Sequence, residues 1–281
     1  MRISFVAVLL TFTGCSAKQA LPEGQVVEVV GSDYAFQVPE KITAGPTVFH
    51  FVNKGKVRHE LNLFMLTRGT TIQQYLHRRK QQKPAQDLID GPIGVLFAEP
   101  GSRSDAGLSA DLIPGRDYVA ICIFKDQPNG PAHYEMGMYA LINAQGPAVA
   151  RGAAARTDSI VGLDYAFKYP TTLAPGHHSF AFENRGKVRH EMVLMRLKKG
   201  VTTDSVLKVA RTNGDTDALI DDAPGLLTAM PGKTSLGRLE VDLIAGREYT
   251  LACFFTDSAK GPPHVALGMY GRILVTGPPV N

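Results

Sequence analysis

The feature that most constrains this chain is an internal repeat. NKGKVRHE occupies residues 53–60 and NRGKVRHE occupies residues 184–191, so the two octapeptides start 131 positions apart. IPGRDYVAICIF from Ile113 and IAGREYTLACFF from Ile244 keep the same offset, as do two copies of DYAF upstream of the octapeptides. A register that never slips indicates a tandem duplication of a unit of about 120 residues, a common size for one domain.

The repeat divides the chain into two domains and a linker. We expect the first domain at 25–144, the second at 158–277 and the linker at 145–157. The stretch NAQGPAVARGAAARTDS around the linker is small, Ala-rich and polar, without an apolar period. At 44% hydrophobic and 20% charged residues, the chain has ordinary globular composition, and each half is long enough to bury its own core.

The first fifteen residues differ from the rest. Arg2 precedes the apolar run ISFVAVLL, and TFTGC follows and ends at Cys15. This is the pattern of a secretory signal, and it is too short to be a permanent membrane span. Gly14 before Cys15 resembles the lipobox of bacterial lipoproteins, which implies cleavage, acylation of the cysteine sulfur and a membrane anchor, with Ser16 favouring the outer membrane. We therefore expect residues 1–15 to be a signal peptide and the protein to be periplasmic and lipid-anchored; an ordinary cleaved signal is the alternative.

Short alternating runs bounded by Gly and Pro predict strands in both halves. Examples are HELNLFML and RDYVAICIF in the first half and HEMVLMRL and REYTLACFF in the second. Their period of two and their content of β-branched and aromatic residues predict an antiparallel sandwich in each half, with one helical piece around 71–82 and another around 203–212. The alternation places His59 and His190 at the start of core-facing rows and points both strand cysteines inward.

Four residue types recur at matched positions in the two halves. They are His59 and His190, Cys122 and Cys253, His133 and His264, and Met138 and Met269. A thiolate and two imidazoles with a weak thioether form the ligand set that suits copper in an electron-transfer site. The sequence therefore predicts these eight residues as metal ligands and copper as the cofactor.

This pattern resembles the cupredoxins, the blue type 1 copper proteins. Their first histidine follows an Asn/Gly-rich strand end, a late strand ends in cysteine, and the next loop carries histidine and methionine. The resemblance covers nearly all of both units and implies two tandem Greek-key β-sandwiches, each with a short helical insertion. It further implies up to two type 1 coppers and one-electron transfer with a redox partner protein in the envelope. Ten residues separate Cys122 from His133, a longer loop than in small cupredoxins and closer to the copper domain of nitrite reductases.

Two other functions remain open at this stage. A metal-free cupredoxin-like module could bind another envelope component, and the same ligands could hold Cu(I) for delivery in the periplasm. An enzyme is not predicted, because multicopper oxidases and copper nitrite reductases need further histidines, and the chain has no His-X-His pair. A net charge of +4 without a basic stripe that alternates with aromatics argues against nucleic acid.

Several nearby residues are assigned simpler roles. Met136 has Leu267 as its counterpart, so it is expected to pack and not to bind metal. Glu60 and Glu191 are expected to point away from the adjacent imidazoles. The histidines without a counterpart are expected at the surface: His50, His77, His177 and His178. The basic residues before each first histidine form either a solvated loop or a docking patch for an acidic redox partner.

Overall fold

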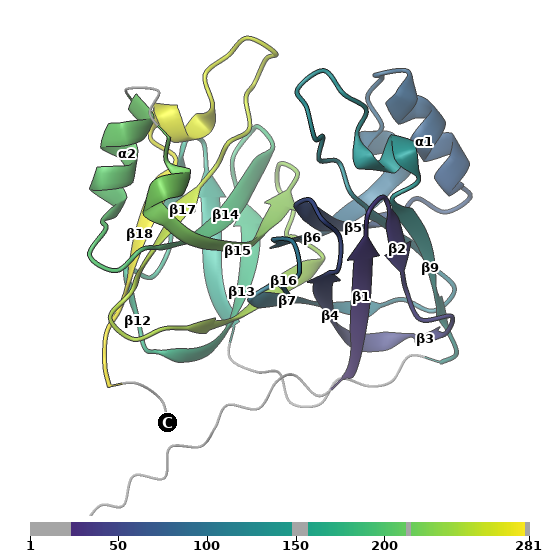
Figure 1. The fold of residues 1–281 in the computed structure, drawn as a ribbon, viewed down its shortest axis with the longest axis horizontal. Coiled ribbons are helices and arrows are strands. Elements are labelled where there is room, and N and C mark those ends of the chain that lie inside the picture. Colours follow the sequence, from purple (N-terminus) through teal and green to yellow (C-terminus); the bar gives the residue numbers. More distant parts are fainter. Residues whose placement is uncertain (1–23, 148–156, 212–214, 279–281) are drawn as a thin grey trace, which may run out of the picture.

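The computed structural model describes residues 24–147, 157–211 and 215–278. The predicted signal peptide with Cys15 and most of the predicted linker lie outside these residues. The described part consists of strands with two short α-helices, which confirms the expected all-β fold built from two sandwiches (Figure 1). No helix in that part is long and apolar enough to cross a bilayer.

The first half contains nine strands and one α-helix. They are β1 (Gln25–Ser32), β2 (Ala35–Gln37), β3 (Ile42–Thr43), β4 (Gly45–Asn53), β5 (His59–Leu66), α1 (Ile72–Lys80), β6 (Ile89–Ala98), β7 (Ala106–Leu112), β8 (Asp117–Ile121) and β9 (Tyr139–Gln145). A 3₁₀ turn, His133–Met136, precedes β9.

The second half repeats this order. Its elements are β10 (Thr157–Leu163), β11 (Ala166–Lys168), β12 (Thr172–Leu173), β13 (Gly176–Asn184), β14 (His190–Leu197), α2 (Thr203–Arg211), β15 (Ile220–Ala229), β16 (Gly237–Leu243), β17 (Glu248–Ala252) and β18 (Tyr270–Val275). The helices fall where the sequence predicts them. α1 begins after Thr71, whose hydroxyl accepts from the Gln74 amide while the Gln74 side chain accepts from the Thr71 amide, a capping box.

The two halves share both sheets and are not joined only through the linker. The eight-stranded sheet has the order β11-β10-β13-β16-β7-β4-β1-β2, and the ten-stranded sheet has the order β12-β18-β17-β14-β15-β6-β5-β8-β9-β3. Duplicated strands meet at the seam, because β7 pairs with β16 and β6 with β15. Leu108 lies opposite Leu239 and Val95 opposite Leu226, each pair being one position and its own duplicate. The halves are therefore related by an approximate two-fold axis through the seam.

The sandwich is mixed, whereas the sequence suggested antiparallel strands throughout. β1 runs parallel to β4, and β10 runs parallel to β13. The cause is the path of the chain between these strands: β2 folds back on β1, and β3 crosses to pair with β9 in the other sheet. The chain therefore returns beside β1 in the same direction.

The strand β5, which carries the predicted ligand His59, is buried on both faces. His59, Leu61 and Leu63 form the predicted core-facing row and have no exposed surface. The opposite face is also covered, so that Glu60 is 4% exposed and Phe64 packs against Tyr75 of α1. A strand that reads as half-buried in sequence thus acquires a second covered face from the helical insertion and from the other half.

Two of the histidines expected at the surface are instead partly buried and contact carboxylates. His177 lies 3.0 Å from the buried Glu240 carboxylate, and His178 lies 2.6 Å from Asp158. Glu240 also accepts a hydrogen bond from Ser109 of the first half. The bond from Ser109 to Glu240 crosses the seam on the eight-stranded sheet, so His177 contacts a carboxylate that links the two halves.

Candidate metal centres

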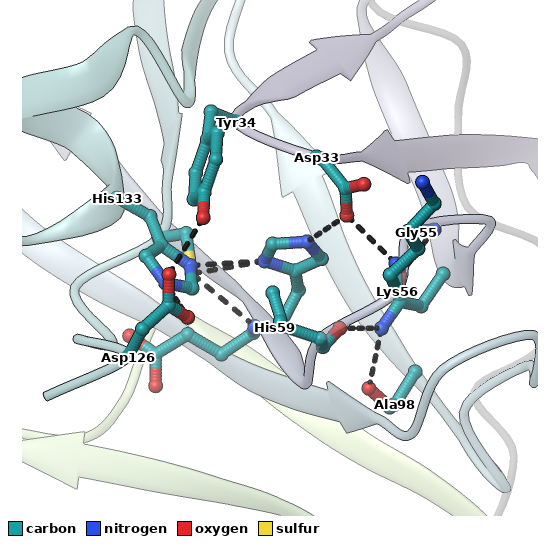
Figure 2. A network of polar contacts seen from close by, with 12 residues as sticks. Asp33, Tyr34, Gly55, Lys56, His59, Ala98, Asp126 and His133 are labelled. Carbon is teal, nitrogen blue, oxygen red and sulfur yellow. Dashed lines mark hydrogen bonds and ion pairs between the residues drawn. The ribbon is translucent and has the colours of Figure 1, made fainter.

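The repeated octapeptide forms a tight loop that delivers the first histidine. Asn53 donates its side-chain amide to the carbonyls of Val57 and Ala98, at 2.8 and 3.0 Å, and its Oδ1 accepts from the Gly55 amide. Asp33 accepts from the Lys56 amide at 2.7 Å (Figure 2). A Cβ at Gly55 would lie 2.5 Å from Asp33 Oδ1 and 2.8 Å from His59 Nε2, so only glycine fits there. The asparagine and the glycine that both octapeptides share are therefore required by the loop that positions the imidazole.

Three of the predicted ligands converge at one end of the first half. His59 Nδ1 and His133 Nδ1 are 3.0 Å apart, and Cys122 Sγ is 3.4 Å from His133 Nδ1 and 3.9 Å from His59 Nδ1. All three side chains are at most 1% exposed. His59 comes from the start of β5, Cys122 follows the end of β8, and His133 begins the 3₁₀ turn that closes the loop.

The spacing of these atoms fits one metal ion. In protein metal sites, bonds from the metal are about 2.0 Å long to nitrogen and about 2.3 Å long to sulfur. Three such donors arranged as a triangle around one ion are roughly 3 to 4 Å apart from one another. Both imidazoles face the centre of the group with Nδ1. Nε2 of His133 contacts the Asp126 carboxylate, so Nδ1 of His133 can offer its lone pair to a metal ion. The soft sulfur with two imidazoles is the donor set of a type 1 copper site, and the residues present fit that cofactor.

Burial governs the protonation of the ligands. Removal from water raises the pKa of the Cys122 thiol to about 12, although the Glu60 backbone N–H, 3.5 Å from Sγ, favours the thiolate. Burial also lowers the pKa of His59, as does the neighbouring His133. The metal-free pocket therefore holds a neutral thiol and a neutral first imidazole, and a bound cation would replace the thiol proton.

A tyrosine and an aspartate cover the second histidine. His133 Nε2 lies 2.9 Å from Asp126 Oδ1, and the Tyr34 hydroxyl donates to Asp126 Oδ2 at 2.6 Å (Figure 2). The Tyr34 ring meets the His133 ring edge-on at a centroid distance of 5.2 Å. The hydrogen bond from Tyr34 lowers the pKa of Asp126. Tyr34 has a φ of 64°, a strained value for a residue with a bulky side chain, so the turn holds it over the site.

Glu60 braces the cysteine from the far side of the strand. Its carboxylate does not reach an imidazole, in agreement with the expected direction of the side chain. Instead Oε1 accepts from the Ile123 amide at 3.1 Å, directly after Cys122. Burial raises the pKa of Glu60 to about 7. The backbone amide of Glu60 thus contacts the Cys122 sulfur, and the Glu60 side chain holds the backbone directly after Cys122.

Met138 is buried beside the same group. It has no exposed surface, its amide donates to the His133 carbonyl at 3.0 Å, and its carbonyl accepts from the Cys122 amide at 3.1 Å. These bonds tie the predicted axial residue to both neighbours in the loop. Its service as an axial ligand stays a prediction. Met136 is 38% exposed, and the packing role expected for it stays a prediction.

The second half repeats this geometry closely. His190 Nδ1 and His264 Nδ1 are 3.1 Å apart, and Cys253 Sγ is 3.4 Å from His264 Nδ1 and 3.8 Å from His190 Nδ1. The covering and bracing contacts recur through Tyr165, Asp257 and Glu191: the Tyr165 hydroxyl donates to Asp257 at 2.6 Å, Asp257 lies 3.0 Å from His264 Nε2, and Glu191 accepts from the Phe254 amide at 2.9 Å. Burial raises the pKa of Cys253 to about 11. Met269 is fully buried.

Sequence reasoning did not assign the covering residues. Tyr34 and Tyr165 lie in the two DYAF copies, and Asp126 and Asp257 stand four positions after each cysteine. The duplication itself was the available signal, because these residues recur at the same offset as the ligands. Within the described residues, the two His–Cys–His groups are the clusters of histidine, cysteine and carboxylate spaced to hold a metal ion.

The described residues thus combine an all-β fold with two buried His–Cys–His groups whose donors fit type 1 copper. Neither a known family profile nor a curated protein sequence matches the chain. Among solved structures, it is similar to a dithionite-reduced auracyanin from Roseiflexus castenholzii, with 25% identity, 44% of this chain and 100% of that chain covered, and a TM-score of 0.30.

Two further structures show the range of the likeness. Auracyanin A from Chloroflexus aurantiacus, described as a blue copper protein, has 20% identity over 43% of this chain and 98% of its own, with a TM-score of 0.28. A copper nitrite reductase from Nitrosomonas europaea has 13% identity over 90% of this chain and 93% of its own, with a TM-score of 0.25.

Proposed function

We propose that this protein carries single electrons on up to two type 1 coppers. The observation that supports the proposal most directly is the buried group of two imidazoles and one thiol in each half, with both Nδ1 atoms and the sulfur facing one another. Copper held by these donors would change oxidation state by one electron.

The surroundings of each group favour electron transfer over substrate chemistry. The three donors are at most 1% exposed, so no reactant has room to approach the metal position directly. The octapeptide loop, Asp126 and Glu60 each hold one donor in place, which limits how far the ligands move between oxidation states. When the ligands move little between Cu(II) and Cu(I), electron transfer requires less reorganisation energy.

The proposed location is the periplasm, with an acyl anchor at Cys15 in the outer membrane. The support is the apolar run before Gly14 and Cys15. Detergent partitioning of the wild type and of Cys15→Ser tests the anchor: the variant should leave the membrane fraction. Unchanged membrane association of the variant would remove the lipid anchor from the proposal.

The proposed partner is a redox protein of the envelope. Lys54 and Lys56 are exposed on the loop that carries His59, and Lys187 is exposed in the duplicate. Positive charge beside a buried redox centre would attract an acidic surface and speed encounter. Electron exchange with such a partner should therefore slow as ionic strength rises.

The visible spectrum of the copper-loaded, oxidised protein tests the function. An intense thiolate-to-copper band that disappears on reduction and returns on oxidation is the expected result. Tight Cu(I) binding without such a band would support copper delivery in place of electron transfer. No copper binding would leave a metal-free binding module.

A further inference from the structure

A groove opens on the outer face of the ten-stranded sheet where the two halves meet; we call it the seam groove. Its volume is about 770 Å³, within the range of small-molecule sites. Val193 and Leu226 of the second half line it, and the first half adds the rings of Phe97 and Phe124. Phe254, 49% exposed, contributes a third ring. An apolar and aromatic lining of this size can bury an organic molecule.

The duplication provides an internal comparison for this groove. The corresponding space in the first half is about 250 Å³, and Phe64 and Tyr75 line it, with ring centroids 4.7 Å apart. The residues at the duplicated positions are the smaller Met195 and Val206. The duplication alone therefore does not explain the seam groove, because larger side chains fill most of the equivalent space in the first half.

Charge distinguishes the two spaces more sharply. Four carboxylates of the seam groove stand at positions whose duplicates are uncharged: Glu99, Asp105, Asp217 and Asp222 correspond to Met230, Leu236, Gln86 and Gly91. With Glu191 and Asp221, six carboxyl groups line the groove against three guanidinium groups. The smaller space has two carboxyl groups, Glu60 and the shared Glu191, and two guanidinium groups, Arg79 and Arg189. The seam groove is thus the acidic member of the pair.

Three of the six carboxyl groups form ion pairs with arginines, namely Glu99, Asp105 and Asp221. Glu99 lies 3.0 Å from Arg58, and Asp105 lies 2.7 Å from Arg196. Asp222 Oδ2 is buried and has no hydrogen-bond donor among the described residues. Burial raises the pKa of Asp222 to about 6, and the negative charge of Asp105 adds to the effect. Asp222 and Asp105 both line the groove, so their carboxyl groups would attract a cation in it and repel an anion.

The groove also touches the residues that hold one of the two cysteines. Glu191 and Phe254 line it. The Glu191 amide donates to Cys253 Sγ at 3.4 Å, and the Glu191 carboxylate accepts from the Phe254 amide at 2.9 Å. A molecule against Phe254 and Glu191 would therefore lie one residue from the second-half thiolate. The first-half cysteine is approached through Phe124, two residues from Cys122.

We propose that the seam groove binds a small organic cation with an aromatic ring, its charge beside Asp222 and its ring against Phe254. Aromatic walls beside a group of carboxylates suit such a molecule through stacking, charge attraction and cation–π contact. The bound molecule perturbs the Cys253 site more strongly than the Cys122 site, which the groove reaches through Arg58 and Phe124; this second statement rests on the proposed copper function.

Binding is tested on the metal-free full chain, so the result does not depend on copper. Isothermal titration compares phenethylammonium with two probes of the same ring and chain length, neutral 2-phenylethanol and anionic phenylacetate. The cation should bind at least tenfold more tightly than either. Asp222→Asn and Phe254→Ala should each weaken its binding at least fivefold, and Ile123→Ala, at the position duplicated in Phe254, should not. Equal affinity for the cation and the neutral probe, or insensitivity to both variants, would overturn the site.

The link to the metal centre is tested separately with single-site proteins. Cys122→Ser retains the second-half site, and Cys253→Ser retains the first-half site. Saturating phenethylammonium should shift the thiolate-to-copper band of the former more than that of the latter. Equal shifts, or none, would remove the link while the titration still decides the binding site. If neither variant shows a copper band, the proposed function fails and the titration result stands by itself.

Discussion

Asp126 Oδ1 lies 2.9 Å from Nε2 of His133, and this contact turns the buried imidazole so that Nδ1 faces Cys122. The same carboxylate accepts from the Tyr34 hydroxyl, so the tyrosine, the aspartate and the histidine form one chain of hydrogen bonds from the partly exposed ring to the metal position. The second half repeats the chain through Asp257. Through this chain, Tyr34 modulates the negative charge that Asp126 places beside His133, the predicted copper ligand.

Asp126→Asn should raise the reduction potential of the first-half copper. The amide oxygen can still accept from Nε2, but the negative charge that favours Cu(II) is lost. Residues in this position contribute roughly 10- to 100-fold in metal affinity. If the loss falls on Cu(II), the potential rises by about 60 to 120 mV for a one-electron couple. Spectroelectrochemistry of each single-site protein measures the change.

Tyr34→Phe provides the opposing control for that experiment. Without the hydroxyl, the Asp126 charge is less satisfied and acts more strongly on His133, so the potential should fall. A potential that moves in the same direction for both variants would contradict the proposed role of the chain, and a change at the second-half site would indicate a general effect on folding.

Copper binding should release one thiol proton from each site near neutral pH. The pKa values of Cys122 and Cys253 are raised to about 12 and about 11, so both thiols are protonated in the metal-free protein. Below these pKa values, each unit of falling pH should lower the apparent affinity about tenfold per site, because protons compete with the metal. Titrations in buffers of different ionisation enthalpy count the protons. Binding without release would show that the thiolates are preformed.

Each half should bind one copper, whether or not the other half holds one. Each half supplies its own two histidines and cysteine, so Cys122→Ser and Cys253→Ser should each remove one copper and part of the visible band. The double variant should remove all of it, since a serine hydroxyl is not a comparable soft donor. Metal analysis and the visible spectrum measure both effects. Loss of both coppers in either single variant would show that the shared sheets couple the sites.

Met269→Leu should preserve the thiolate band and raise the potential of the second-half copper. A buried thioether that supports Cu(II) would be replaced by a side chain of similar size that gives no donor. Met138→Leu should do the same to the first-half copper, and Met136→Leu in that half is its control, because Met136 is 38% exposed and should change neither property. A potential that responds to Met136 and not to Met269 or Met138 would reassign the axial position.

The sequence predicted the ligand rows because period-two alternation directly determines which side chains share a face. His59, Leu61 and Leu63 follow that rule, and so does the inward Cys122. The pairing of β7 with β16 could not be predicted in the same way. Strand edges meet through backbone groups, which are the same for every residue, so AGLSADL carries no sign that its edge faces a second copy. The covering of His133 by Tyr34 likewise depends on a positive-φ turn that composition does not encode.

Gly55→Ala should damage the first-half site alone, and Gly186→Ala the second-half site alone. An added Cβ at Gly55 would lie 2.5 Å from Asp33 Oδ1 and 2.8 Å from His59 Nε2, and at Gly186 it would lie 2.5 Å from Asp164 Oδ1 and 2.9 Å from His190 Nε2. Since the loop cannot accept these contacts, the imidazole must move, and each variant should bind one copper. Gly130→Ala is the control: its Cβ would meet nothing closer than 3.3 Å, so both coppers should remain. Two coppers with unchanged spectra in Gly55→Ala would show that the octapeptide does not position the ligand.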